Sequence, residues 1–150
     1  MTILIEKGAR RLTAQKDGQT LCCRIALGSA PIGHKQREGD GKTPEGEYSV
    51  CLKRDTGKFG CALGISYPSA KDARQAVQDG RLESQLLPLF EDAEAAQKRP
   101  PWGTSLGGEI YIHGGGSAQD WTAGCIALDD ADMQALYAMA TEGDAVRIIP

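Results

Sequence analysis

One histidine and one cysteine of this sequence are spaced so that they could act together on a substrate. His113 precedes Cys125 by 12 positions (125 − 113 = 12). A thiol attacks a carbonyl carbon as its thiolate, and a nearby imidazole can take up the thiol proton. Nucleophilic catalysis is therefore one interpretation of the pair. The other is that the two residues are unrelated, which is the more common case at this separation.

Glycines on both sides of the pair favour the catalytic interpretation. His113 is followed by Gly114–Gly116, where the backbone can turn sharply without side-chain clashes. Gly124 stands directly before Cys125 and leaves room for a substrate carbonyl beside backbone N–H groups. We predict that the N–H groups of Gly124 and Cys125 form an oxyanion hole.

The other cysteines predict neither a metal site nor a redox motif. The sequence has no CxxC pair and only two histidines, whereas a structural zinc site takes four ligands. Cysteine catalysis needs no cofactor, and none is expected. Five cysteines leave at least one thiol unpaired in a monomer. We interpret four of them as small buried hydrophobic residues, with disulfides left open: Cys22, Cys23, Cys51 and Cys61. Cys22 and Cys23 are adjacent in a predicted strand and should point to opposite faces.

The elements that must position the pair are mostly strands. Alternating patterns and turn residues predict strands over 2–6, 11–16, 20–27, 47–53, 60–67, 109–113 and 145–149. Asp17-Gly18 is typical of a hairpin turn. The polar loop Gly28–Gly46 holds five glycines and two prolines, which exclude a helix or a central strand. A loop of this length is usually functional or mobile.

Three helices are predicted in the second half of the chain. One spans 70–78 behind a Ser69–Asp72 capping box. A second spans 91–98, because that segment is acidic at its start and basic at its end. The third runs over 129–139, with the first aspartate as its N-cap. With no repeats and no linker, residues 1–150 are predicted to form a single domain that is mainly β with a few short helices.

The charge pattern excludes some classes of partner. The chain has 17 basic and 20 acidic side chains and no cluster of Lys or Arg, so a nucleic-acid partner is not expected. No apolar run approaches the ~20 residues that span a bilayer, so no transmembrane segment is expected. Met1–Glu6 enters a strand pattern at once and lacks the features of a signal peptide. A cytoplasmic location and a leader already removed both stay open.

Three segments together resemble the L,D-transpeptidase catalytic domain family (YkuD-like). They are ALGSAPIGHKQREGDGKTPEGEYSV, ISYPSAKDA and IHGGGSAQDWTAGCIAL, and the resemblance covers most of the chain. It implies a mostly β sandwich or barrel-like core with the cysteine and histidine at one end. It also implies that Cys125 is the nucleophile and His113 its base, with the backbone carbonyl of Gly114 orienting the imidazole.

The resemblance also implies a reaction and a location. Family members act on peptidoglycan stem tetrapeptides outside the cytoplasmic membrane, in the periplasm or cell envelope. The cysteine attacks the carbonyl of meso-diaminopimelate, releases the terminal D-Ala and forms a thioester, which an amine of another stem or water resolves. The chain is expected to act as a monomer.

Two positions of this chain depart from the family pattern near the nucleophile. Ala123 stands where many members have histidine, and Ala127 stands where Arg or Asn is common. Thr122 begins the [ST]-x-G-C turn and is a candidate substrate contact. Trp121 could equally wall the substrate cleft or anchor its loop on the core.

The long polar loop offers further candidates. Lys35 and Lys42 could each meet a substrate carboxylate. Asp40 and Thr43 are interpreted instead as structural residues, because Asp and Thr side chains so often bond turns.

Three functions are compatible with these residues. The first is L,D-transpeptidation, and the second is hydrolysis by the same site, as an L,D-carboxypeptidase or amidase. The third is a non-catalytic wall-binding module. The first two share the thioester and differ in whether an amine or water resolves it.

Overall fold

The first three strands form an antiparallel meander whose alternate side chains point inward. The computed structural model describes all 150 residues. Strands β1 (Thr2–Glu6), β2 (Arg11–Lys16) and β3 (Gln19–Ala26) pair in order along the chain. Asp17 and Gly18 have φ values of 48° and 79°, as a two-residue hairpin turn requires. The predicted hairpin is confirmed.

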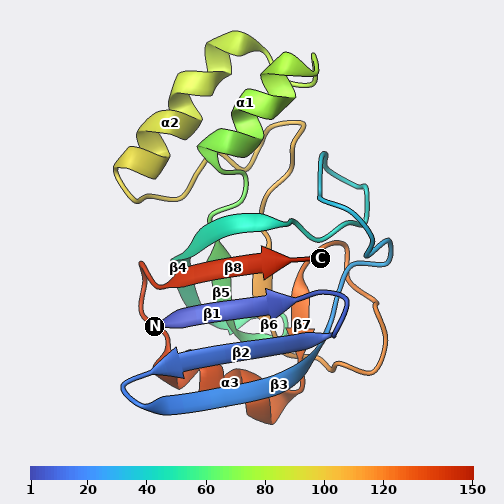
Figure 1. Ribbon diagram of the computed structural model, residues 1–150, viewed down its shortest axis with the longest axis vertical. Coiled ribbons are helices and arrows are strands. Elements are labelled where there is room, and N and C mark those ends of the chain that lie inside the picture. Colours follow the sequence, from blue (N-terminus) through green and yellow to red (C-terminus); the bar gives the residue numbers. More distant parts are fainter.

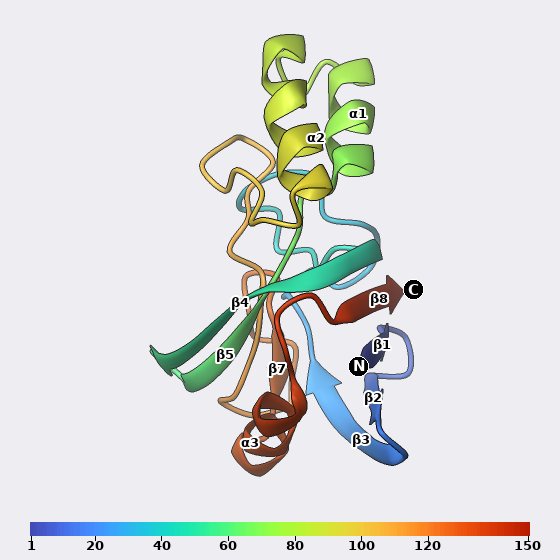
Figure 2. The same ribbon diagram turned by 90° about the vertical axis from the view of Figure 1, so that its left-hand side faces the viewer.

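Five further strands close the sheet into a barrel (Figures 1 and 2). They are β4 (Gly46–Gly57), β5 (Gly60–Ile65), β6 (Tyr111–His113), β7 (Ile126–Leu128) and β8 (Ala145–Ile149). The order around the barrel is β1-β2-β3-β7-β6-β5-β4-β8. Most neighbours are antiparallel, but β8 runs parallel to β1 and β7 runs parallel to β6. The predicted mainly β, barrel-like fold is confirmed.

Aliphatic side chains fill the barrel, and one helix closes its end. Helix α3 (Asp130–Met139) buries Met133 and Leu136 in the same cluster as the strand residues. Figure 1 shows this helix beside β3, on the side of the barrel away from the other helices. Burial of such residues supplies the main driving force for folding, because it removes apolar surface from water.

A helical hairpin packs outside the barrel with a small core of its own. Helix α1 (Ala70–Gln78), a short 3₁₀ turn (Ser84–Leu86) and helix α2 (Leu87–Ala95) bury Ala73, Ala76, Leu82, Phe90 and Leu106 together. Ser69 and Asp72 bond reciprocally at the start of α1, so the predicted capping box is confirmed. Figure 2 shows the two helices side by side, beyond the barrel.

Two helix predictions need correction. The helix expected over 91–98 spans Leu87–Ala95, with Pro88 in its first turn, where its missing N–H costs nothing. Its first turn has no acidic residue and its last turn no basic one, so the helix-dipole reasoning was wrong here. Asp129 stands at the N-cap of α3 but makes no capping bond. Its carboxylate instead accepts hydrogen bonds from the N–H and hydroxyl of Ser117, at 3.0 and 2.9 Å.

All five cysteines are free thiols. Cys23 is buried and Cys22 is exposed, which confirms that the two point to opposite faces. The interpretation of Cys22 as a buried hydrophobic residue was wrong, because its side chain takes the outer face of β3. Cys51 and Cys61 are partly buried.

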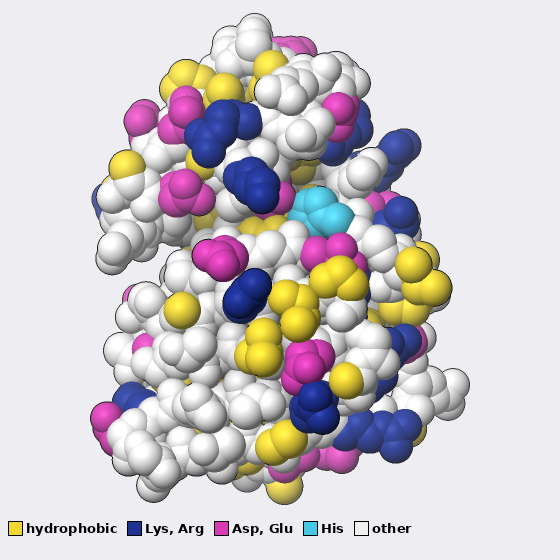
Figure 3. All heavy atoms as spheres, in the orientation of Figure 1, with side chains coloured by type: hydrophobic (Ala, Val, Ile, Leu, Met, Phe, Trp, Pro, Cys, Tyr) yellow, Lys and Arg dark blue, Asp and Glu magenta, His cyan; other side chains and the backbone are white.

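The surface carries charges of both signs. Acidic and basic side chains are interspersed over the face seen in Figure 3. No helix has the length and apolar character needed to cross a membrane.

Candidate active site

The pairing of β6 with β7 brings the histidine and the cysteine to one face of the sheet. Ile112 pairs with Ile126, and both are fully buried in the barrel. Since side chains alternate along a strand, His113 and Cys125 project from the opposite face. The parallel register, continued back by one residue, sets Cys125 beside Tyr111. The Tyr111 N–H accordingly donates a hydrogen bond to Cys125 Sγ at 3.3 Å.

His113 and Cys125 line one cavity of about 170 Å³. The hairpin that joins β4 to β5 supplies much of its wall, and the ends of these strands project together from the barrel in Figure 2. The cavity is lined by Arg54, Gly57, Lys58, Phe59, Gly60, Ala62, Tyr111, His113 and Cys125. The structure therefore brings together the two residues on which the sequence prediction depends.

The imidazole of His113 is held in a defined orientation. Its Nδ1 lies 2.5 Å from the carbonyl oxygen of Gly114. A carbonyl oxygen can only accept, so Nδ1 carries a proton and Nε2 of the neutral ring is left as the acceptor. This contact is the one that the family resemblance implied for Gly114, and its role in catalysis stays a proposal.

Two aromatic rings pack against the imidazole. The Phe59 ring stacks on His113 with centroids 4.6 Å apart and an interplanar angle of 14°. The Trp121 ring meets His113 edge-on at 5.6 Å and Phe59 at 5.1 Å. The Trp121 indole N–H donates to the Gly116 carbonyl at 3.0 Å. Trp121 thus anchors its loop and also contributes to the wall of an adjoining open cavity that Phe59 shares.

Burial keeps the resting pair neutral. Burial raises the pKa of the Cys125 thiol, opposed by the Tyr111 N–H and the charge of Lys35. Burial also lowers the pKa of His113, opposed by the hydrogen bond to Gly114. The thiol of Cys125 lies 3.6 Å from the Glu109 carbonyl oxygen, to which it can donate. In the resting state burial thus favours the neutral thiol of Cys125 and the neutral imidazole of His113.

The turn before the cysteine is fixed by Thr122 and Gly124. The Gly124 N–H donates to Thr122 Oγ1 at 3.1 Å, and this hydroxyl donates to the Cys125 carbonyl at 2.7 Å. Gly124 has a φ of +143°, and a Cβ there would lie 2.8 Å from the Lys42 carbonyl oxygen. Only glycine fits this position without strain. Because the Gly124 N–H is already bonded, its use in an oxyanion hole requires that bond to open, whereas the Cys125 N–H has no such partner.

Neither lysine predicted to meet substrate lines this cavity. The Lys35 side chain is buried and its ammonium forms an ion pair with Asp40 at 2.9 Å. Asp40 also accepts the N–H groups of Gln36, Arg37 and Lys42. Burial alone would raise the pKa of Asp40, but these hydrogen bonds lower it to about 2. This geometry agrees with the structural interpretation of Asp40.

Thr43 also has a structural contact. Its hydroxyl accepts the Gly28 N–H at 3.1 Å and its side chain is fully buried. The contact ties the end of the long loop to the end of β3. The loop therefore reaches the site through its backbone, which packs under Gly124 at Lys42.

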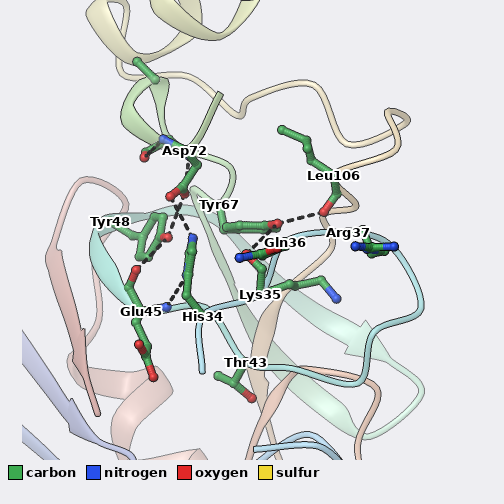
Figure 4. A network of polar contacts seen from close by, with 12 residues as sticks. His34, Lys35, Gln36, Arg37, Thr43, Glu45, Tyr48, Tyr67, Asp72 and Leu106 are labelled. Atoms are coloured by element: carbon green, nitrogen blue, oxygen red, sulfur yellow. Dashed lines mark hydrogen bonds and ion pairs between the residues drawn. The ribbon is translucent and has the colours of Figure 1, made fainter. Parts of the chain in front are cut away.

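A larger cavity of about 620 Å³ lies between the helical hairpin and the barrel. Figure 4 shows the polar network along it. The Glu45 N–H donates to Nδ1 of His34 at 2.8 Å, so Nε2 carries the proton and donates to Asp72 at 3.0 Å. The Tyr48 hydroxyl donates to the other oxygen of Asp72 at 2.7 Å. These hydrogen bonds leave none of the named groups without a partner, and they connect the long loop to α1. No cysteine lines this cavity.

The two cavities share no lining residue. The smaller one is the candidate active site, because both His113 and Cys125 line it. No group of three or more His, Cys, Asp or Glu side chains is arranged to hold a metal ion.

Apart from His113 and Cys125, sequence reasoning missed the residues that line the Cys125 cavity. Phe59, Arg54 and Lys58 come from the β4–β5 hairpin, more than 50 residues before the cysteine. The only signal was the short segment between two predicted strands, since a hairpin beside a strand end places its tip there.

Comparisons with known proteins identify the family and the fold. The L,D-transpeptidase catalytic domain family matches residues 1–148. A point mutant of the helical cell shape determining protein Pgp2 from Campylobacter jejuni is similar in structure, with 25% identity and a TM-score of 0.65 over 98% of this chain and 46% of that one. A search of curated proteins gave no match.

Two mycobacterial structures share the fold at lower identity. An L,D-transpeptidase from Mycobacterium smegmatis has 13% identity and a TM-score of 0.57, over 99% of this chain and 58% of that one. One from Mycobacterium tuberculosis H37Rv has 15% identity and a TM-score of 0.57, over 99% and 57%. The chain thus spans about half the length of the structures it matches. The fold, the paired His113 and Cys125 and the match over nearly all residues lead to one conclusion: the chain belongs to the L,D-transpeptidase catalytic domain family.

Proposed function

We propose that this protein is a cysteine-dependent L,D-transpeptidase that acts on peptidoglycan stem tetrapeptides in the cell envelope. The observation that carries the proposal is the shared cavity of His113 and Cys125, with Nδ1 of the histidine bonded to the Gly114 carbonyl. The family match supports the substrate class, because family members act on the cell wall. The substrate, the transfer step and the location of this chain are all part of the proposal.

The geometry supports a thioester mechanism. Cys125 Sγ attacks the carbonyl carbon of diaminopimelate while Nε2 of His113 takes the thiol proton. The negative oxygen that forms is met by the Cys125 N–H, and by the Gly124 N–H once that group leaves Thr122. The C–N bond then breaks, His113 returns the proton to the leaving nitrogen of D-Ala, and the acyl group stays on sulfur as a thioester.

The second half of the reaction decides between two activities. An amine of another stem gives a crosslink, whereas water gives a tripeptide, and both release Cys125 as a thiol. His113 serves in either case by taking the proton of the attacking group. The alternative activity is therefore an L,D-carboxypeptidase or amidase at the same site.

The test is incubation with a defined disaccharide-tetrapeptide, followed by mass spectrometry of products and protein. Crosslinked dimer indicates transpeptidation, and tripeptide alone indicates hydrolysis. Both require an acyl adduct on the peptide that contains Cys125, which Cys125→Ala removes. Cys22→Ala is the matched control, because it deletes an exposed thiol on β3. If Cys125 forms no adduct with substrate or with carbapenem-like acylating agents, the chain is a non-catalytic wall-binding module.

A further inference from the structure

The charge of the Cys125 cavity points to one chemical class of ligand. Besides His113, Tyr111 and Cys125, the ionisable side chains in its lining are Arg54 and Lys58, and no Asp or Glu takes part. Arg54 and Lys58 are exposed to solvent, and two cations in the lining of a cavity beside Cys125 attract an anionic ligand through their positive potential.

Arg54 and Lys58 have no acidic partner in the protein. Neither forms an ion pair or a side-chain hydrogen bond. Each is held by an aromatic ring instead: the Arg54 guanidinium lies 5.4 Å from the centre of the Tyr111 ring, and the Lys58 ammonium lies 5.4 Å from that of Phe59. A cation–π contact orients the cation and leaves its N–H donors free.

Neither lysine of the long loop competes for this role, because neither lines the cavity. Lys35 is neutralised by Asp40, and its ammonium is out of reach of solvent. The substrate carboxylate that the sequence assigned to Lys35 or Lys42 thus has better partners on the β4–β5 hairpin. Ala127 stands where Arg or Asn is common in the family. It is fully buried and offers no polar side chain to the cavity.

We propose that Arg54 and Lys58 bind the terminal carboxylate of the leaving residue, which makes the site specific for a free C-terminus. This inference rests on the proposed function for its substrate. In a stem tetrapeptide the D-Ala carboxylate lies three bonds beyond the attacked carbonyl carbon, so it stays close to Cys125 and can reach the cavity lining. The planar guanidinium of Arg54 can bind a carboxylate through two N–H groups, and Lys58 adds a point charge.

A first experiment tests the anion site without any peptidoglycan. Cys125 is alkylated with iodoacetate, which is anionic, or with iodoacetamide, which is neutral. In both cases thiolate sulfur attacks the CH₂ carbon, the C–S bond forms and iodide leaves. Peptide mapping gives the rate ratio of the two reagents at Cys125, with exposed Cys22 as an internal reference in the same sample.

We expect the iodoacetate-to-iodoacetamide ratio at Cys125 to fall about threefold in Arg54→Gln or Lys58→Gln and about tenfold in the double variant, at low ionic strength. The ratio at Cys22 should stay constant. Arg37→Gln is the charge-matched control, since Arg37 is exposed and its side chain makes no hydrogen bond. An unchanged ratio at Cys125 in the double variant overturns the proposal.

A second experiment compares a tetrapeptide that ends in free D-Ala with its C-terminal amide. The native protein should favour the free acid, Arg54→Gln should lose most of that preference through a higher KM, and Arg54→Lys should keep part of it. If neither peptide is processed but the alkylation ratio still responds, the anion site stands and the proposed function fails. If both peptides are processed with the same preference in all variants, the function stands and the carboxylate assignment fails.

Discussion

Asp40 is the residue whose replacement should weaken the long loop most. Its Oδ1 accepts the Lys35 ammonium at 2.9 Å and the Lys42 N–H at 3.1 Å. Its Oδ2 accepts the N–H groups of Gln36 and Arg37, at 2.8 and 3.1 Å. In Asp40→Asn the amide NH₂ must replace one of these oxygens, so two donors lose their acceptor whichever way the side chain is turned.

The magnitude follows from the pKa of Asp40. Hydrogen bonds lower it from 3.8 to about 2 in spite of burial. At 1.36 kcal/mol per pKa unit, the charged carboxylate stabilises the fold by about 2.5 kcal/mol. Asp40→Asn should therefore lower the free energy of unfolding by about 2.5 kcal/mol at pH 7, and Tm by about 5–10 °C for a domain of this size.

The lowered pKa of Asp40 also predicts how its contribution to stability changes with pH. The folded carboxyl binds a proton less readily than the unfolded one, so the stabilisation is complete above pH ~4 and is lost as the pH falls toward 2. Urea unfolding at several pH values between 7 and 2.5 should show the gap between native protein and Asp40→Asn closing over that range. Asp92→Asn is the control, because Asp92 is exposed on α2 and its side chain makes no hydrogen bond. A variant within ~0.5 kcal/mol of the native protein at pH 7, or a gap that does not narrow in acid, refutes the reasoning.

Three other measurements test the site. Gly124→Ala should cost about 2 kcal/mol of stability and most of the acylation rate, because its φ is +143° and its Cβ meets the Lys42 carbonyl; thermal unfolding and adduct mass spectrometry measure both. Phe59→Ala should slow acylation about tenfold with little change in Tm, because it frees the imidazole of His113 while Phe59 itself is 37% exposed. The rate of substrate acylation should persist below pH ~6.5, because burial lowers the pKa of His113 and keeps the imidazole neutral. Iodoacetamide, in contrast, should label Cys125 efficiently only above the pH at which an ordinary thiol ionises, because burial raises the pKa of the Cys125 thiol. If both reaction rates depend on pH in the same way, and His113→Ala changes neither, the general-base role of His113 is contradicted.

Local patterns were sufficient to predict most elements of the fold. The hairpin at Asp17-Gly18, the Ser69 capping box and the alternating strands are set by residues within a few positions of one another. The predicted ends of strands were wrong where a contact with a residue distant in the sequence determines them. The predicted strand over 109–113 begins at Tyr111, because Glu109 has a φ of 53° and its carbonyl faces Cys125.

The cavity wall could not be predicted, because pairing between strands far apart in the sequence builds it. Ala62 on β5 pairs with His113 on β6, and this register places the hairpin tip over the imidazole. Nothing in the residues around Phe59 indicates that its ring stacks on His113. The charges of Arg54 and Lys58 were visible in the sequence, but their place beside Cys125 depends on the same pairing.

The position of Cys125 is ultimately set by side chains that face the barrel interior. Ile112 and Ile126 are both fully buried and pair in the parallel register of β6 and β7. A slip of one residue in β7 would put Ile126 outside and turn Cys125 into the core, because strand side chains alternate. Exposing one isoleucine and its neighbours to water costs a free energy several times the thermal energy, so the population with the slipped register is negligible. The arrangement of His113 and Cys125 on the outer face of the barrel is thus maintained by the apolar packing of Ile112 and Ile126 on the inner face.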